Sequence, residues 1–150
     1  MLTTIPPNPG TGWLIVGGWL SVAAALLHIA CIVGGPEWYR FFGAGEGMAR
    51  AAARGDLRPV LITLGIASVL LVWGAYAFSG AGLFPRLPLL RTGLVFITAI
   101  YLLRGLVFVP LHMWRPQHND SFAIWSSLIV LAYGAAYAVG TLKAWRHLVP

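Results

Sequence analysis

The chain has 150 residues, of which 59% are hydrophobic and only 9% are charged. Soluble domains carry about 25% charged residues, so the composition excludes an ordinary soluble domain and indicates a membrane protein. The net charge of +6 lies at the ends of apolar segments and in short connections, where basic residues contact lipid headgroups. Because no basic cluster with interleaved aromatics is present, we exclude nucleic acid as a partner.

Four apolar segments of about 20 residues account for most of the chain. They cover residues 12–33, 59–78, 89–111 and 122–145. Each segment is apolar on all sides, unlike the alternating strands of a membrane barrel. Short connections make consecutive helices antiparallel neighbours. The sequence therefore predicts an all-α fold, in which residues 1–150 form one integral membrane domain, an antiparallel bundle of four transmembrane helices.

The first segment follows a tail, Met1 to Thr11, that contains no Lys or Arg. A secretory signal peptide has a basic region before a shorter apolar core, so we interpret residues 12–33 as a retained span. The run Gly34-Gly35-Pro36 predicts the end of this helix. The single cysteine, Cys31, cannot form an intramolecular disulfide, and this argues against an oxidoreductase that works through paired thiols.

The longest connection, residues 35–58, mixes charged and aromatic side chains in its first part. Its second part predicts a short helix from Glu46 to Arg54, because good helix formers there place charges four residues apart on one face. Asp56 is placed to cap the second span, with Pro59 in the first turn of that span. We expect this connection to line the mouth of a site. The alternative is an interfacial aromatic belt whose charges face headgroups.

The third span contains a buried-charge problem. Arg104 lies about 6 Å beyond the middle of residues 89–111, and a charge near the bilayer centre costs about 2.5–3.5 kcal/mol on insertion scales. Tyr101 lies three residues earlier, on the same helical face. His28 lies about 7 Å beyond the middle of the first span. The first and third spans are parallel in an up-down bundle, so His28 and Arg104 are displaced toward the same end, which also holds the long connection.

These positions predict a pocket in one half of the bundle. Its ligand-binding candidates are His28, Glu37, Trp38, Arg40, Glu46, Tyr101 and Arg104. In this interpretation Arg104 binds an anionic or carbonyl oxygen, Glu37 or Glu46 balances it, and His28 transfers a proton or donates a hydrogen bond. In the structural alternative, Arg104 pairs with Glu46 and His28 bonds a backbone carbonyl, so that both residues hold the bundle together. The fourth span offers a second polar stripe, made of Ser126, Tyr133, Tyr137 and Thr141.

No cofactor is predicted. A bundle cytochrome needs histidines facing each other at matched depth, and His28 is the only histidine well inside a span. No ligand spacing typical of a structural metal occurs either.

The overall plan, with His28 late in the first span, then Gly34-Gly35 and an aromatic connection, resembles the small bacterial four-helix membrane proteins of the DoxX-like type. The resemblance covers the whole chain in length and span pattern. It implies a four-helix bundle in the bacterial inner membrane, and no active-site residue is carried over, since no site motif matches.

Three functions remain open. The first is binding of a lipid-like or amphipathic small molecule in the polar pocket, in contact with membrane lipid. The second is an accessory or structural subunit, in a homo-oligomer or a larger complex, for which small residues such as Gly65 and Gly134 allow close helix contact. The third is a membrane-embedded enzyme that uses His28 and a carboxylate in acid-base chemistry. Counting Lys and Arg at the two ends gives four against five; we expect both termini in the cytoplasm, because the basic charge on that side is almost undiluted by acids.

Overall fold

The computed structural model describes residues 8–113 and 120–148, and side chains there outside 108–113, 120, 121 and 123. Within these residues it is all helical. The elements are α1 (Thr11–Phe41), α2 (Glu46–Ala53), α3 (Arg58–Gly80), α4 (Leu90–Met113), α5 (Asp120–Ala144) and a short 3-10 helix, η1 (Trp145–His147). The helices α1, α3, α4 and α5 are long and apolar enough to cross a membrane. The predicted all-α class and the four-helix bundle are confirmed.

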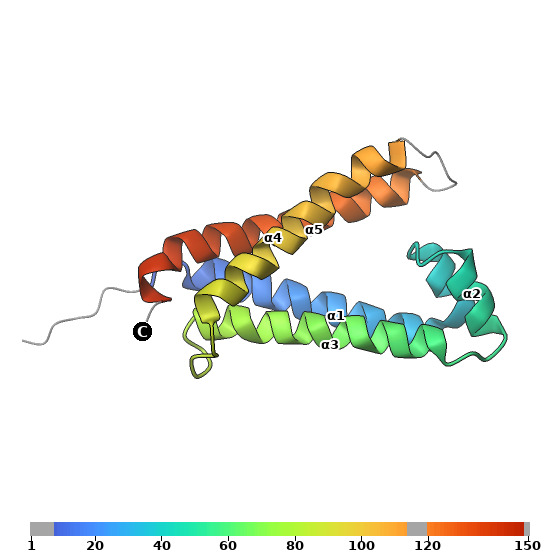
Figure 1. Ribbon diagram of the computed structural model, residues 1–150, viewed down its shortest axis with the longest axis horizontal. Helices are drawn as coiled ribbons and strands as arrows, with labels where there is room; N and C mark the ends of the chain where they lie inside the picture. Colours follow the sequence, from blue (N-terminus) through green and yellow to red (C-terminus); the bar gives the residue numbers. More distant parts are fainter. Residues whose placement is uncertain (1–7, 114–119, 149–150) are drawn as a thin grey trace, which may run out of the picture.

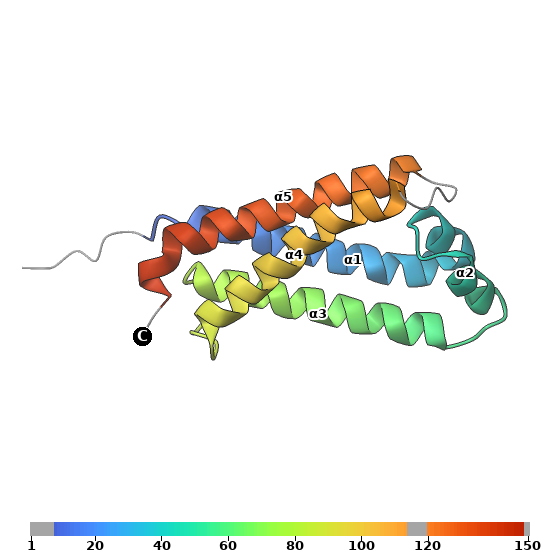
Figure 2. The ribbon, with the colours of Figure 1, turned by 45° about the horizontal axis from the view of Figure 1, so that its top comes forward.

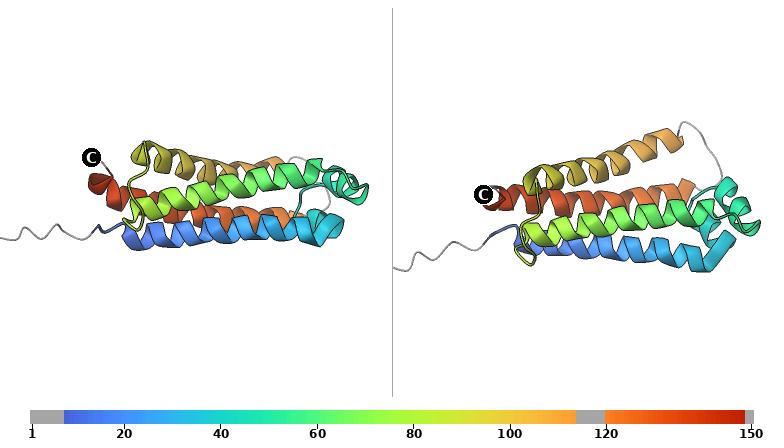
Figure 3. Two further views of the ribbon diagram at one scale, coloured as in Figure 1. Left: turned by 90° about the horizontal axis from the view of Figure 1, so that it is seen from below. Right: turned by 60° about the horizontal axis from the view of Figure 1, so that its bottom comes forward.

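The four long helices form two pairs. α1 packs along α3 and α4 packs along α5, and the pairs meet mainly through α1 and α5 (Figures 1 and 2). In the left view of Figure 3 the axes of the four long helices are nearly parallel. The start of α1, the α3–α4 turn and η1 lie at one end of the bundle, which we call the tail end. The helix α2 lies at the opposite end, which we call the α2 end (Figure 1).

Buried positions recur every three or four residues along the long helices, which is the spacing of a helix-packing seam. On α3 they are Pro59, Thr63, Ala67, Leu70, Gly74 and Ala77. On α5 they include Ser127, Gly134, Tyr137, Thr141 and Ala144. Most other apolar side chains on these helices are exposed, as suits surfaces that face lipid. The core therefore follows narrow seams between helices.

Glycines allow the helices of the second pair to approach closely. A Cβ atom added at Gly105 on α4 would lie 2.5 Å from the Leu131 side chain of α5. One added at Gly134 on α5 would lie 2.7 Å from the Leu102 side chain of α4. The two contacts are reciprocal, so α4 and α5 interlock as small-residue interfaces in membranes do.

The first helix does not end where the sequence predicts. Gly35 adopts φ 70° and ψ −153° inside α1, and helix resumes at Pro36 to Phe41. The positive φ suits glycine, and Pro36 fits the first turn of the resumed helix because it lacks an N–H to donate. The predicted stop at Gly34-Gly35-Pro36 is therefore a kink, and the first part of the predicted connection is helical. A Cβ at Gly34 would lie 2.1 Å from the Trp38 ring, so the bend needs glycine there too.

The rest of the long connection follows the prediction except at the cap of α3, where Leu57 rather than Asp56 is the N-cap residue. Helix α2 spans Glu46–Ala53, against a predicted helix from Glu46 to Arg54. The Asp56 carboxylate accepts a hydrogen bond from the backbone N–H of Arg58 at 2.9 Å, and Pro59 occupies the first turn of α3. A small apolar cluster of Cys31, Tyr39 and Ala49 joins α1 to α2. The α2 end is thus an ordered cap on the α1–α3 pair.

Candidate functional site

A chain of buried hydroxyl groups crosses the middle of the bundle. The Ser21 hydroxyl of α1 lies 2.8 Å from the Tyr101 hydroxyl of α4 and 2.8 Å from the Tyr137 hydroxyl of α5. The Tyr137 hydroxyl donates a hydrogen bond to the backbone carbonyl of Trp73 on α3, at 3.0 Å. Each of the four candidate spans therefore contributes one group to this chain.

The direction of the chain follows from proton counting. Each hydroxyl has a single proton, and that of Tyr137 is given to the Trp73 carbonyl. Ser21 must therefore donate to Tyr137, and Tyr101 must donate to Ser21. The Tyr101 oxygen is the starting point, and within the described residues it accepts no hydrogen bond. Tyr101 is only 5% exposed, so this oxygen is a buried acceptor.

Aromatic rings pack around the Tyr101 ring. The ring centroid of Tyr101 lies 4.9 Å from that of Trp73, 5.3 Å from Tyr137 and 5.6 Å from Tyr133. The Trp73 and Tyr133 rings stand edge-on to Tyr101, an arrangement that aromatic quadrupoles favour. Packing on three sides fixes the orientation of the Tyr101 ring and thereby its hydroxyl. The predicted site residue Tyr101 is thus held firmly by neighbours from the other spans.

Arg104 lies one turn beyond Tyr101 toward the α2 end. The buried positions of α4 among the described side chains are Leu90, Leu94, Ile97, Tyr101 and Gly105, and Arg104 lies beside this seam, three residues after Tyr101. Its side chain is half-buried. The Arg104 cation therefore lies beside the seam, on the face of α4 that carries Tyr101.

His28 continues the seam of α1, two turns beyond Ser21. Its Nδ1 lies 2.7 Å from the backbone carbonyl of Ala24. A carbonyl only accepts, so Nδ1 carries the proton in this bond, and Nε2 of the neutral ring is an acceptor. The bond to a carbonyl of its own helix is the one that the structural alternative predicts for His28. It also fixes the ring and leaves the chemistry of Nε2 open.

The charged residues at the end of α1 and in α2 form a separate cluster. The Arg40 guanidinium contacts the Glu37 carboxylate at 2.6 Å and the Glu46 carboxylate at 2.9 Å. Arg50 approaches Glu46 at 3.8 Å. The hydrogen bonds from Arg40 lower the pKa of the Glu46 carboxyl below its ordinary range. All these side chains are exposed, so the cluster clamps the end of α1 to α2 at the surface.

The predicted seven-residue site is therefore divided between two places. Glu37, Arg40 and Glu46 come together at the α2 end, and Trp38 packs beside them against Phe42, with ring centroids 5.7 Å apart. The ion pairs that Glu37 and Glu46 make among the described residues are with Arg40 and Arg50. The predicted pairing of either acid with Arg104 is not one of them, because Arg40 lies much closer along the chain to both.

Sequence reasoning missed two members of the hydroxyl chain. Ser21 is a single small polar residue in an apolar span, and Trp73 contributes only a backbone carbonyl, so neither has a sequence signal. The polar stripe predicted for the fourth span did contain Tyr133 and Tyr137, which both contact Tyr101.

Comparison with known proteins provides no relative: no protein-family model, curated protein or solved structure matches this chain. The function must therefore be argued from the residues described above.

Proposed function

We propose that this protein binds the polar head of a small amphipathic, lipid-like molecule between its helix pairs, on the α2 side of Tyr101. The observation that carries the proposal is the directed hydroxyl chain. It leaves the oxygen of a buried, ring-fixed tyrosine as an acceptor in a protein whose exposed surface is largely apolar.

The neighbouring positions supply complementary chemistry. A ligand hydroxyl or N–H donates to the Tyr101 oxygen, and a ligand carbonyl or carboxylate accepts from the Arg104 guanidinium. The His28 Nε2 adds a second acceptor on α1 at the same half of the bundle. The apolar tail of the ligand then lies along the exposed apolar faces of the helices. Intramembrane charges usually serve function, which favours this use of Arg104.

For location we propose the bacterial inner membrane, with the tail end on the cytoplasmic side. All four acidic residues, Glu37, Glu46, Asp56 and Asp120, lie toward the α2 end, so the basic residues of the tail end stand alone. Undiluted Lys and Arg favour the cytoplasmic side. Single cysteines at positions 82 and 143 of a Cys31→Ser protein should react together from the cytoplasm, and a cysteine at position 54 should react from the opposite side. Labelling of positions 82 and 143 from opposite sides would overturn the bundle topology itself.

The test of ligand binding uses Trp73 as a reporter. The probe is 5-doxyl-stearate, an amphipathic carboxylate whose nitroxide quenches tryptophan, titrated into the purified protein in mild detergent. We expect saturable quenching, and a Trp73→Phe variant should lose that saturable component because the ring nearest Tyr101 is removed. Arg104→Gln should weaken saturation about tenfold, the cost of about one charge-assisted hydrogen bond. The matched control is Arg54→Gln, an exposed arginine near α2.

Quenching that does not saturate, or that Arg104→Gln and Arg54→Gln change equally, would contradict the proposal. Native mass spectrometry of the same preparation separates the remaining functions. A bound small molecule supports the pocket, whereas a stable complex with other subunits and no small molecule favours the accessory-subunit alternative.

A further inference from the structure

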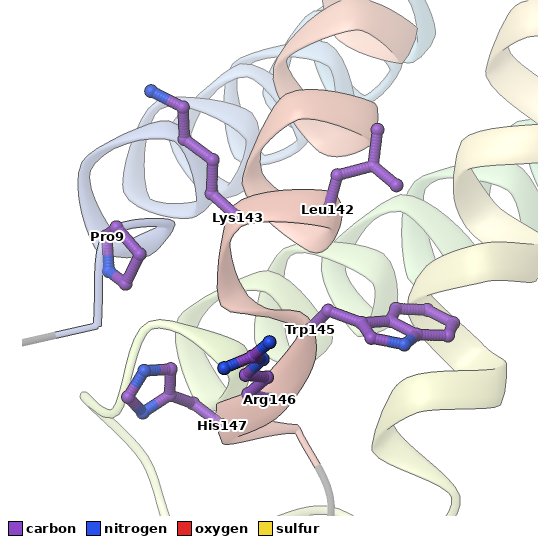
Figure 4. Close-up of a pocket in the computed structure, with 6 residues that line it drawn as sticks. All are labelled: Pro9, Leu142, Lys143, Trp145, Arg146 and His147. Atoms are coloured by element: carbon purple, nitrogen blue, oxygen red, sulfur yellow. The ribbon is translucent and has the colours of Figure 1, made fainter.

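A hollow of about 400 Å³ lies at the tail end, remote from the hydroxyl chain. Its lining is basic and apolar, and comes from the last turn of α5, from η1 and from a residue two positions before α1: Pro9, Leu142, Lys143, Trp145, Arg146 and His147 (Figure 4). Figure 4 shows Lys143 on the side of Pro9, with Arg146 and His147 below it and Trp145 directed toward α4. The hollow therefore lies at the level where a span meets headgroups.

The positive charge of this hollow is uncompensated. Lys143 and Arg146 make no ion pair within the described part of the chain, and all four acidic residues lie toward the α2 end. Both side chains are exposed. Two exposed cations without an acidic partner among the described residues attract an anion.

Two further arginines contact residues that line the hollow. Arg86 donates a hydrogen bond at 2.5 Å to the backbone carbonyl of His147, which covers one of the negative carbonyl groups at the end of the α5–η1 segment. The Arg91 guanidinium lies 3.3 Å from the centroid of the Trp145 ring and holds the indole by a cation–π contact. Arg86 thus removes a source of repulsion, and Arg91 fixes the apolar wall.

The start of α1 adds a favourable dipole. Gly10 packs so closely on α5 that a Cβ there would lie 2.2 Å from the Gly140 carbonyl oxygen, and this contact places Pro9 at the rim. The first turn of α1 contains no acidic residue. The positive end of this long helix therefore reinforces Lys143 and Arg146.

We propose that this hollow binds the phosphate of an anionic phospholipid from the leaflet at the tail end. Lys143 and Arg146 contact the phosphate. Leu142, which is 72% exposed, and Trp145 offer apolar surface to the glycerol backbone and the first methylene groups. A free phosphate ion would use the cations alone and leave this apolar surface without a partner, which is why the lipid is the better occupant.

The experiment measures lipid binding to the full chain by native mass spectrometry from detergent, with phosphatidylglycerol as the anionic probe and phosphatidylcholine as the zwitterionic one. The test variant is Lys143→Gln/Arg146→Gln. The matched control is Arg54→Gln/Arg58→Gln, which removes the same charge from exposed positions near α2. We expect the affinity for phosphatidylglycerol to fall about 30-fold in the test variant, since each basic residue contributes about a factor of five.

The affinity of the control variant for phosphatidylglycerol should stay within about twofold of that of the parent protein, because Arg54 and Arg58 lie far from the hollow and act independently of it. Equal losses in both variants would overturn the proposal by showing attraction to net charge alone, and so would unchanged binding in the test variant. The variant Lys143→Arg/Arg146→Lys keeps the charge and should retain phosphatidylglycerol binding. Loss of binding in this variant would also contradict the assignment. If an equal concentration of inorganic phosphate displaces phosphatidylglycerol, the ligand is a free anion and the lipid assignment is wrong.

Discussion

Removing single hydroxyls from the buried chain tests how many bonds each hydroxyl makes and what these bonds contribute to stability. Ser21→Ala removes the bonds to Tyr101 and Tyr137, and Tyr137→Phe removes the bonds to Ser21 and to the Trp73 carbonyl. Interhelical hydrogen bonds in membrane proteins contribute about 0.6 kcal/mol each. Each single variant should therefore lose about 1.2 kcal/mol of unfolding free energy, whereas Tyr101→Phe, which removes one bond, should lose about 0.6 kcal/mol.

The double variant separates a connected chain from independent contacts. Ser21→Ala/Tyr137→Phe removes three distinct bonds, because the bond between the two residues is counted in both single variants. The expected loss is about 1.8 kcal/mol, which falls short of the sum of the single losses by about 0.6 kcal/mol. That shortfall is the energy of the Ser21–Tyr137 bond.

The measurement is unfolding by dodecyl sulfate in mixed micelles, followed by circular dichroism. Tyr76→Phe is the control, since the Tyr76 hydroxyl donates to the Pro88 carbonyl at an exposed position and its loss should change stability by less than about 0.5 kcal/mol. Additive losses in the double variant would show that Ser21 and Tyr137 do not share a bond. A larger loss for Tyr101→Phe than for Tyr137→Phe would show that the Tyr101 hydroxyl makes bonds beyond the one to Ser21, and would remove the acceptor on which the ligand proposal depends.

Two other predictions concern packing and pH. Gly10→Ala should destabilise the protein by about 1–3 kcal/mol, because its Cβ would meet the Gly140 backbone oxygen, which cannot rotate away. Gly65→Ala, with nothing within 4 Å of the added Cβ, should cause no loss in the same dodecyl sulfate titration. The lowered pKa of Glu46 means that its bond to Arg40 stabilises the folded protein above the ordinary carboxyl range and that this contribution is lost as the pH falls through the lowered value. Glu46→Gln should therefore reduce the thermal midpoint slightly at neutral pH and show less acid dependence than the parent; an equal acid response in both proteins would contradict the assignment.

The fold could be predicted because the length of an apolar run is a strong constraint in lipid. Unsatisfied backbone groups force such runs into helices, and short connections force neighbours to be antiparallel. The Gly34-Gly35-Pro36 kink could not be predicted with the same rules, because the residues that end a helix are also those that bend one. The outcome depends on tertiary contacts: the Trp38 ring covers Gly34, and the Tyr39 hydroxyl accepts a hydrogen bond from Thr63 on α3 at 3.3 Å.

The candidate site was predicted in part for a related reason. Charged residues in an apolar chain are conspicuous, so the sequence favoured an ion pair between Arg104 and one of the acids at the α2 end, Glu37 or Glu46. The acids are engaged by Arg40 instead, three residues from Glu37 and six from Glu46, because a local pair costs less chain entropy than a pair between spans. Ser21 carries no such signal, and only the assembled bundle shows that its hydroxyl joins α1 to α4 and α5.

The two ends of the bundle handle positive charge in different ways, and the difference follows from where the acids lie. At the α2 end the carboxylate of Glu46 lies beside Arg40 and Arg50, and its pair with Arg40 joins α1 to α2. At the tail end no acid is near in the sequence. Arg86 donates a hydrogen bond to the His147 carbonyl, and Arg91 stacks on the Trp145 ring. Lys143 and Arg146 have neither of these partners, and both line the hollow at the tail end. Anionic lipid is concentrated at the membrane surface that every copy of such a protein meets, so the same lack of acids that favours a cytoplasmic tail end also favours a lipid phosphate as the partner of these two residues.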